Sequence, residues 1–153
     1  MRSPTPDAPA PGSSNTPFSL AEVRDAAELR RRLRRFLAHG DATVRRFGLT
    51  PQRYLLLLAV KGAPDGSASR TIGGIADDLQ LAQSSATELV DRAEAAGLIV
   101  RTAGPHDGRV VTITLSAEGE KRFAEAFAAL GGDRAELLAH LDHARRHLTR
   151  DRR

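Results

Sequence analysis

Polar side chains that can hydrogen-bond to nucleic-acid bases gather in one short stretch of this 153-residue chain. They are Gln83, Ser84, Ser85, Thr87, Glu88 and Arg92. Short hydroxyl side chains near the start of a helix can bond base edges, and the free N–H groups there favour phosphate. The stretch therefore carries the chemistry of a DNA-contacting surface, provided that it forms a helix.

The flanking residues predict that helix and the elements that hold it. Apolar residues recur at helical spacing over 72–79 and over 83–96, with 80–82 as a turn between them. Gly97 closes the second helix, since a left-handed backbone costs glycine nothing. Strands at 98–100 and 110–115 flank the turn-rich segment 103–108. This order predicts a winged helix-turn-helix with a two-stranded wing, a motif whose second helix usually enters the major groove of DNA.

Two segments carry a resemblance to the MarR family of bacterial transcriptional regulators, which extends from about residue 20 to 149. Its most specific parts are Leu-Val-Asp-Arg at 89–92, Gly-Leu at 97–98 and Asp-x-Arg at 107–109. The resemblance implies a mainly helical, winged helix-turn-helix homodimer that binds a pseudo-palindromic site in duplex DNA. It also implies that Ser84, Ser85, Thr87 and Glu88 fall where the family contacts bases.

The predicted wing carries Asp107 and Arg109. The resemblance implies that Arg109 enters the minor groove and that Asp107 holds it in place. Two residues apart on a strand, both side chains lie on one face, and a narrow minor groove attracts arginine. The alternative is an ordinary surface ion pair, which stabilises little. We also expect Arg101, at the base of the wing, to contact DNA.

The charge of the predicted reading helices opposes DNA binding. Residues 71–100 hold one basic residue, Arg92, against five acidic ones. The acidic residues are Asp77, Asp78, Glu88, Asp91 and Glu94. Because duplex affinity depends on neutralising phosphates, arginines elsewhere must compensate for this excess. The alternative function is a protein-interaction module of the same fold, with its acidic face docked on a basic protein.

The rest of the chain divides into a tail, two helical flanks and a lobe. Residues 1–17 hold five of the eight prolines and predict a disordered tail. Over 18–149 we expect one domain, with dimerisation helices at 18–48 and 117–149, a DNA-binding lobe at 50–116, and a basic end at 150–153. Ser19, Thr50 and Ser116 should cap helices, whereas 61–70 should form a loop.

The two helical flanks predict a dimer. Gly40 interrupts the first flank and could bend or split its helix. Gly131-Gly132 should end the helix that follows Ser116, with Asp133 capping a new helix. That helix has a narrow apolar stripe at 3.5-residue spacing, which favours packing against another helix. The stripe consists of Leu137, Leu141, Ala144 and Leu148. We expect the flanks of two subunits to pack together around a two-fold axis.

Regulation by a small molecule is a further implication of the resemblance. The family implies an effector, often an aromatic acid or phenol, held between the dimer helices and the DNA-binding lobe. We expect a pocket lined by Phe36, His39, Arg53 and Tyr54. Effector binding would then shift the population toward a spacing of the two reading helices that no longer fits DNA.

Other function classes find little support in the composition. His140, His143 and His147 fall on one side of the last helix and could ligate zinc, although an exposed flank is the alternative. The absence of cysteine excludes disulfides and thiolate sites, and no phosphate loop, Rossmann fingerprint or nucleophile elbow occurs. We therefore expect no enzyme, no cofactor and no membrane segment, and a cytoplasmic protein with a net charge of +4.

Overall fold

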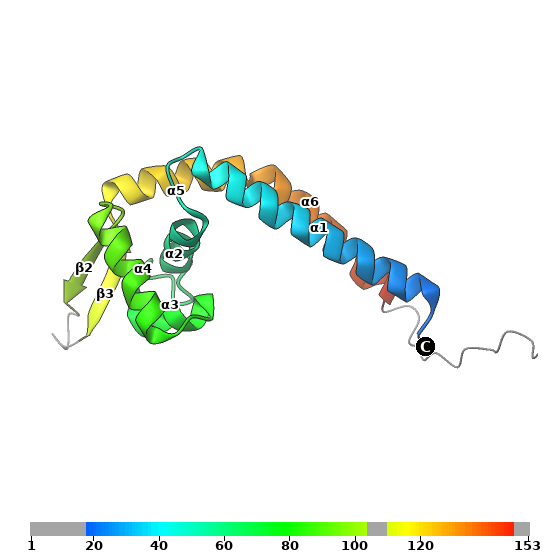
Figure 1. The fold of residues 1–153 in the computed structure, drawn as a ribbon, viewed down its shortest axis with the longest axis horizontal. Helices are drawn as coiled ribbons and strands as arrows, with labels where there is room; N and C mark the ends of the chain where they lie inside the picture. The colour runs from blue at the N-terminus through cyan, green and yellow to red at the C-terminus, as the bar shows by residue number, and fades with distance from the viewer. Residues whose placement is uncertain (1–17, 104–109, 149–153) are drawn as a thin grey trace, which may run out of the picture.

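The computed structural model describes residues 18–103 and 110–148, and within them the side chains up to residue 145. The described residues form a mainly helical fold with one small sheet (Figure 1). Its elements are α1 (Leu20–Arg45), α2 (Pro51–Lys61), β1 (Arg70–Thr71), α3 (Ile72–Leu79), α4 (Gln83–Ala95), β2 (Ile99–Ala103), β3 (Val111–Leu115), α5 (Ala117–Ala129) and α6 (Gly131–Leu148).

Three predicted helix caps are confirmed by hydrogen bonds. At α1, the Glu22 amide donates to Ser19 Oγ (3.2 Å) and the Ser19 amide donates back to the Glu22 carboxylate (2.6 Å). Thr50 Oγ1 accepts from a backbone amide in the first turn of α2 at 3.2 Å, and Ser116 Oγ accepts from the Gly119 amide of α5 at 3.0 Å. Each cap satisfies an amide that the helix itself leaves unpaired, so these residues fix where the helices begin.

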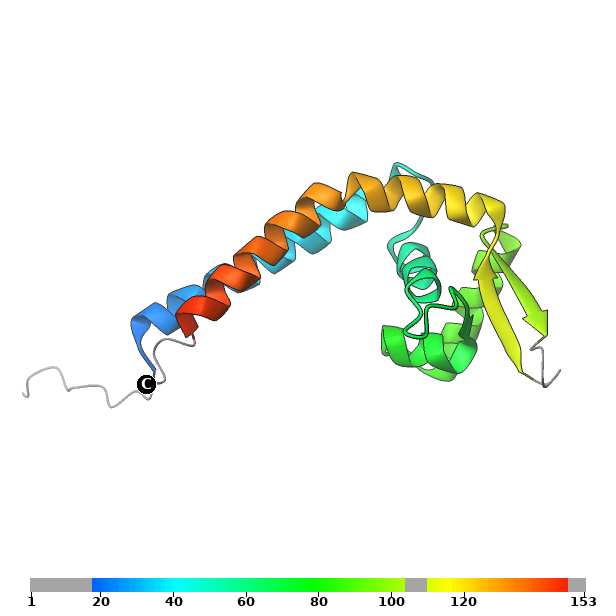
Figure 2. The same ribbon diagram turned by 180° about the vertical axis from the view of Figure 1, so that it is seen from behind.

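A long arm of two helices extends from a more compact lobe. Helices α1 and α6 lie side by side and run in opposite directions (Figures 1 and 2). Helix α1 continues through Gly40 without a break. The predicted cap at Asp133 is wrong, because α6 begins at Gly131 and Asp133 lies in its first turn. There its carboxylate lies 3.3 Å from His39 Nε2 of α1, so it joins the two helices instead of capping one.

The lobe is built around α2, as its apolar sequence predicts. Leu56, Leu57 and Val60 of this helix are fully buried. They share one core with residues of α3, α4, β3 and α5, among them Ile75, Val90, Ile113 and Phe123. A helix buried on most sides can hold the elements around it in fixed positions.

The sheet has three strands, not two as predicted. Strand β1 pairs with β3, which also pairs with β2, so that the antiparallel order is β1-β3-β2. Residues 61–70 were expected to form a loop, and Thr71 was not assigned to a strand. Thr71 caps α3, with its Oγ1 accepting from the Gly74 amide at 3.1 Å. The extended backbone that a cap requires also lets Arg70 and Thr71 pair with β3.

The junction between the lobe and α5 is tightly packed. Gly97 has a φ of +71°, which confirms the predicted left-handed end of α4. In the first turn of α5, a Cβ atom on Gly119 would lie 1.9 Å from the carbonyl oxygen of Leu98. Ser116 Oγ also donates to the carbonyl of Gly97. Helix α5 is therefore held directly against the start of β2.

Candidate nucleic-acid interface

Helix α4 presents the predicted polar residues on its outer face. Its inner face is closed by Ala86, Leu89, Val90 and Ala93, each at most 3% exposed. Gln83, Ser84, Ser85, Glu88 and Arg92 are exposed, whereas Thr87 is half-buried. The Thr87 hydroxyl donates to the carbonyl of Gln83 (2.9 Å). Ala82, at the N-cap, has no side-chain acceptor, which leaves the first amides of α4 available to a phosphate.

The acidic residues of the reading helices are largely paired. Asp78 binds Arg70, with nitrogen–oxygen distances of 2.6 and 2.8 Å. Glu88 lies 3.5 Å from Arg92 of the same helix. Two further carboxylates, those of Asp91 and Glu94, share one guanidinium. The negative charge counted over 71–100 is therefore offset locally by arginines, two of which lie just outside that range.

Arg101 supplies that shared guanidinium. It projects from β2 toward α4, where Nη1 donates to Glu94 Oε2 (2.8 Å) and Nη2 donates to Asp91. Its side chain is 30% exposed. The sequence predicted a contact with DNA for this residue, but the structure directs its guanidinium to the protein's own carboxylates.

The strands of the predicted wing pair as expected. Cross-strand neighbours run from Ile99 opposite Leu115 to Ala103 opposite Val111. Asp107 and Arg109, to which the minor-groove contact was assigned, lie outside the described residues. Their roles stay predictions, and the paired strands supply the hairpin on which those predictions depend.

A basic hollow lies beside α4, between the end of α1 and the start of α2. Arg45, Arg53 and Arg92 line it, together with Thr50 and Leu89. Arg53 Nη2 donates to the main-chain carbonyl of Arg92 at 3.4 Å. Arg53 was predicted to line an effector pocket, but here it contributes positive charge next to the reading helix.

A separate apolar cavity of about 180 Å³ lies where the arm meets the lobe. Phe36 and Tyr54, two of the predicted effector residues, line it. Tyr54 stacks on Phe123, with ring centroids 5.9 Å apart. Residues of α1, α2, α5 and α6 together form the wall, so the cavity touches both the arm and the lobe.

Two charged residues line this otherwise apolar cavity, Asp41 of α1 and Arg134 of α6. The guanidinium of Arg134 lies 3.7 Å from the centre of the Phe127 ring, and its Nη2 donates to the carbonyl of Phe127 (2.7 Å). Its Nη1 is buried and finds no hydrogen-bond partner among the described residues. Burial raises the pKa of the nearby Tyr54 hydroxyl, while the positive charge of Arg134 acts in the opposite direction. Arg134 and Phe127 were absent from the predicted site because they lie on either side of the glycine pair, far along the chain from Tyr54.

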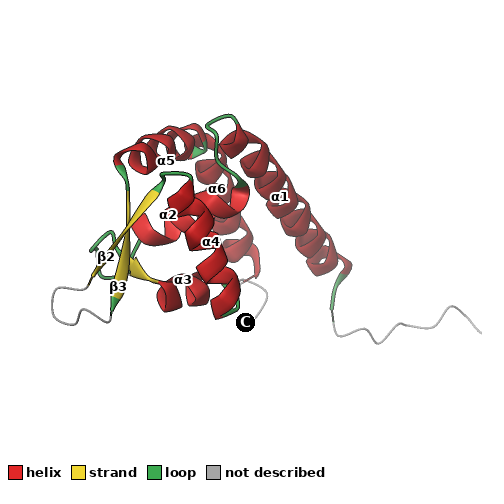
Figure 3. Cartoon of the chain, turned by 60° about the vertical axis from the view of Figure 1, so that its left-hand side comes forward, coloured by secondary structure: helices red, strands yellow, loops and turns green. Residues whose placement is uncertain are grey.

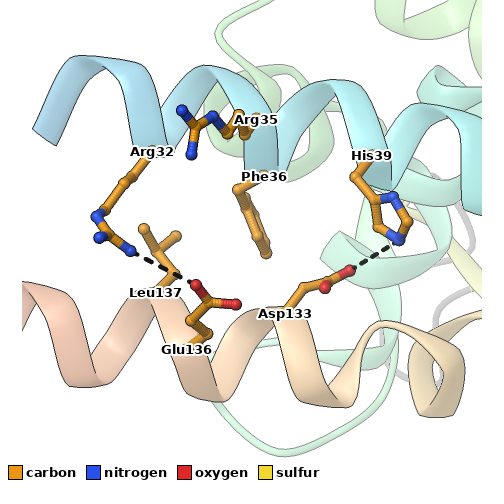
Figure 4. A pocket seen from close by; sticks show the side chains of 7 residues that line it. All are labelled: Arg32, Arg35, Phe36, His39, Asp133, Glu136 and Leu137. Atoms are coloured by element: carbon orange, nitrogen blue, oxygen red, sulfur yellow. Dashed lines mark hydrogen bonds and ion pairs between the residues drawn. The ribbon is translucent and has the colours of Figure 1, made fainter. Parts of the chain in front are cut away.

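His39 lies in another hollow, on the arm between α1 and α6 (Figure 4). Its imidazole faces Asp133, and nearby Arg32 Nη1 lies 3.5 Å from Glu136 Oε1. Phe36 lines both this hollow and the apolar cavity. The four predicted effector residues are thus divided among three hollows: Phe36 shares one with His39 and another with Tyr54, whereas Arg53 lies in the third.

The structure does not assemble a metal site from the residues it describes. His140 and His143 line a hollow with Asp25 and Glu28. No group of three or more potential metal ligands with suitable geometry occurs among the described residues. The side chain of His147 lies outside them, so the proposed three-histidine set is not tested. Within the same residues, no helix combines the length and the hydropathy needed to cross a membrane.

Comparison with known proteins places this architecture in a family. A model of the MarR family matches residues 47–110. The regulator YsmB of Bacillus subtilis (strain 168) is 31% identical over 107 residues, which cover 67% of this chain and 70% of YsmB. The repressor MdtR of the same strain is 31% identical over 94 residues, covering 61% of this chain but only 58% of MdtR.

Solved structures show the same fold. The structure of NadR in complex with 4-hydroxyphenylacetate superposes with a TM-score of 0.63 at 20% identity, covering 93% of this chain and 94% of that one. At this identity the likeness is one of fold. Together with the sequence matches, it shows that the chain belongs to the MarR family of transcription regulators.

Proposed function

We propose that this protein is a sequence-specific DNA-binding regulator, acting as a repressor on a pseudo-palindromic operator. The observation that carries the proposal is helix α4, whose inner face is locked in the core while Gln83, Ser84, Ser85 and Glu88 face outward. A helix held in this way, followed by a hairpin, matches the usual geometry of major-groove reading. The similarity to MdtR, which is named a transcriptional repressor, supports the choice of repression.

The proposed unit of binding is a homodimer. Large apolar side chains of α1 and α6 remain exposed along the arm, including Leu20, Leu37 and Leu138 at 77, 55 and 62%. A soluble protein rarely leaves such residues uncovered along two adjacent helices. A second copy of the arm would cover them and place two α4 helices about one turn of DNA apart.

The alternative of a protein-interaction module is not favoured. That alternative was based on the acidic excess of residues 71–100. Arginines form ion pairs with four of those five carboxylates. The face that α4 presents is therefore much less acidic than the sequence alone suggests.

Fluorescence anisotropy tests DNA binding directly. The purified protein is titrated with the duplex upstream of its own gene and with a scrambled duplex, over a series of salt concentrations. We expect tight binding to the first only, with affinity that falls steeply as salt rises, because phosphate contacts release counterions. Equal weak binding to both duplexes across the salt series would contradict a sequence-specific regulator.

Replacing Arg109 with alanine tests the proposed wing contact. We expect a loss of about 1–3 kcal/mol in operator affinity, since the substitution removes an arginine from the minor groove. Arg24→Ala is the matched control, because Arg24 lies in the first turns of α1 at the outer end of the arm. If Arg109→Ala binds the operator as tightly as Arg24→Ala, the wing assignment is wrong.

The apolar cavity is the proposed site of an anionic aromatic effector. Phe36, Tyr54 and Phe127 contribute aromatic side chains to its wall, and Nη1 of Arg134, which has no hydrogen-bond partner among the described residues, can donate to a carboxylate. The fold relative NadR was solved with 4-hydroxyphenylacetate, a ligand of this chemistry. A ligand here would touch both the arm and the lobe, and could thereby change the separation of the two α4 helices in a dimer.

Isothermal titration calorimetry can report ligand entry, because the phenol of 4-hydroxyphenylacetate has the same absorption and emission as the side chain of Tyr54. With this compound as the probe, we expect saturable binding and release of the operator duplex. Arg134→Gln should weaken binding at least about tenfold, because a charge-assisted hydrogen bond contributes about 1.5–3 kcal/mol. His39→Gln, in the neighbouring hollow, should leave the affinity unchanged. Equal affinity of both variants would show that Arg134 does not bind the carboxylate.

A further inference from the structure

Two arginines, one on each edge strand of the sheet, lie opposite the same residue of the central strand. Arg70 of β1 and Arg101 of β2 are both paired across from Ile113 of β3. Directly opposite residues in a sheet project to the same face. Ile113 is fully buried, so this face is the one that packs on the helices of the lobe (Figure 3).

On edge strand β1, Arg70 binds residues of α3. Its Nε and Nη2 donate to the two carboxylate oxygens of Asp78 at 2.8 and 2.6 Å, and Nη2 also lies 3.4 Å from the carbonyl of Gly74. The two side chains are 23% and 33% exposed. A two-pronged contact of this kind fixes orientation as well as distance.

On the other edge strand, β2, Arg101 holds α4. Its two Nη atoms bind Asp91 and Glu94, which lie on the same side of that helix and nearly one turn apart. Arg101 and Glu94 are partly buried and Asp91 is exposed. The three charges form one connected network, and such networks stabilise more than isolated surface pairs do. Strands β1 and β2 thus each bind a different helix of the helix-turn-helix through an arginine.

We propose that Arg70 and Arg101 are positioning residues that lock both helices of the motif to the sheet. The wing and α4 then approach DNA as one rigid body, and the base of the wing stays in register with the reading helix. This inference rests on the proposed function, because it concerns how the DNA-binding elements are aligned. Asp78, Asp91 and Glu94 serve as anchors for the lock rather than as part of the surface that faces DNA.

The proposed contacts of Arg70 and Arg101 predict a change in DNA affinity of opposite sign to the one that simple electrostatics predicts. Removing negative charges near a DNA surface should strengthen binding, since less charge repels the phosphates. If Asp91 and Glu94 anchor Arg101, removing their charges should instead weaken binding, because the wing is no longer held in place. The sign of the change therefore separates the two accounts.

The test uses the full-length double variant Asp91→Asn/Glu94→Gln, which keeps side-chain size. We expect operator affinity to fall about 5- to 10-fold at constant salt, a coupling typical of residues in one network. Asp78→Asn should lower it in the same direction. Asp77→Asn is the matched control, because Asp77 is the exposed neighbour of Asp78 on α3, and it should leave affinity equal or slightly higher. Unchanged or tighter binding by the double variant overturns the proposal.

The ratio of affinities for two different duplexes is a second measurement, which a loss of protein stability alone would not change. A second operator has altered base pairs at its flanks, where the wing is expected to lie. The wild type should bind this operator more weakly than the original one, whereas the double variant should bind both with nearly equal affinity. Arg101→Lys replaces the two-pronged guanidinium with a single ammonium. Its discrimination between the two duplexes should lie between that of the wild type and that of the double variant. If the double variant discriminates between the two duplexes as the wild type does, the wing is not held by this network.

Amide hydrogen exchange of the DNA-free protein separates this proposal from the proposed function. In the double variant, exchange should accelerate in β2 and β3 while α2 stays protected. This result would support the lock even if no operator were bound. Unchanged exchange in the strands would overturn the lock, whereas failure of the wild type to bind any specific duplex would count against the proposed function alone.

Discussion

Gly119→Ala is expected to lower the free energy of unfolding by about 2–3 kcal/mol, the range of an overpacked core. The added Cβ would lie 1.9 Å from the carbonyl oxygen of Leu98, and a backbone atom cannot turn aside as a side chain can. Either α5 or the start of β2 must move. The change should appear as a lower denaturant midpoint, followed by circular dichroism, at an unchanged slope.

Gly132→Ala provides the control for this substitution. Gly132 is also in a helix, and a Cβ there would meet nothing within 4 Å. We expect a gain of about 0.5–1 kcal/mol, because alanine restricts the unfolded chain more than glycine does. Equal midpoints for Gly119→Ala and the wild type would mean that α5 is not seated against Leu98 as described.

Ile113→Ala should cost about 3 kcal/mol of stability, within the usual range for removing a large buried aliphatic side chain. Ile113 is fully buried in the central strand, between the two arginines that bind α3 and α4. The cavity left behind would lie beneath the whole sheet. Thermal unfolding should show a midpoint lowered by several degrees, since about 1 kcal/mol shifts a domain of this size by roughly 2–4 °C or slightly more.

Val111→Ala, two residues earlier on the same face of β3, is the companion variant. Val111 is 39% exposed, so we expect a loss below about 1 kcal/mol. If the two alanine variants melt at the same temperature, Ile113 does not occupy the core position assigned to it.

Much of the fold could be predicted because local chemistry determines it. Ser19, Thr50 and Ser116 cap their helices through side-chain contacts three residues away, which a sequence pattern reveals. The apolar run of α2 predicts its burial for the same reason, since the signal lies within one element. The outward face of α4 follows from the spacing of its buried residues.

Features that depend on distant partners could not be predicted in this way. Strand β1 has two residues and no periodicity, and it exists because β3, some forty residues later, pairs with it. Asp133 has the right type for a cap, but His39 of the other arm helix binds its carboxylate. Arg101 carries the charge expected for a phosphate contact, yet its position across from α4 gives it two carboxylate partners.

The position of the apolar cavity has a mechanical consequence. The cavity lies at the root of the arm, whereas α4 and the wing strands lie farther out in the lobe. A rotation of the lobe about that root acts as a lever, so the displacement of α4 grows with its distance from the pivot. If the proposed effector binds there, a small shift of the cavity wall would therefore become a larger displacement of α4.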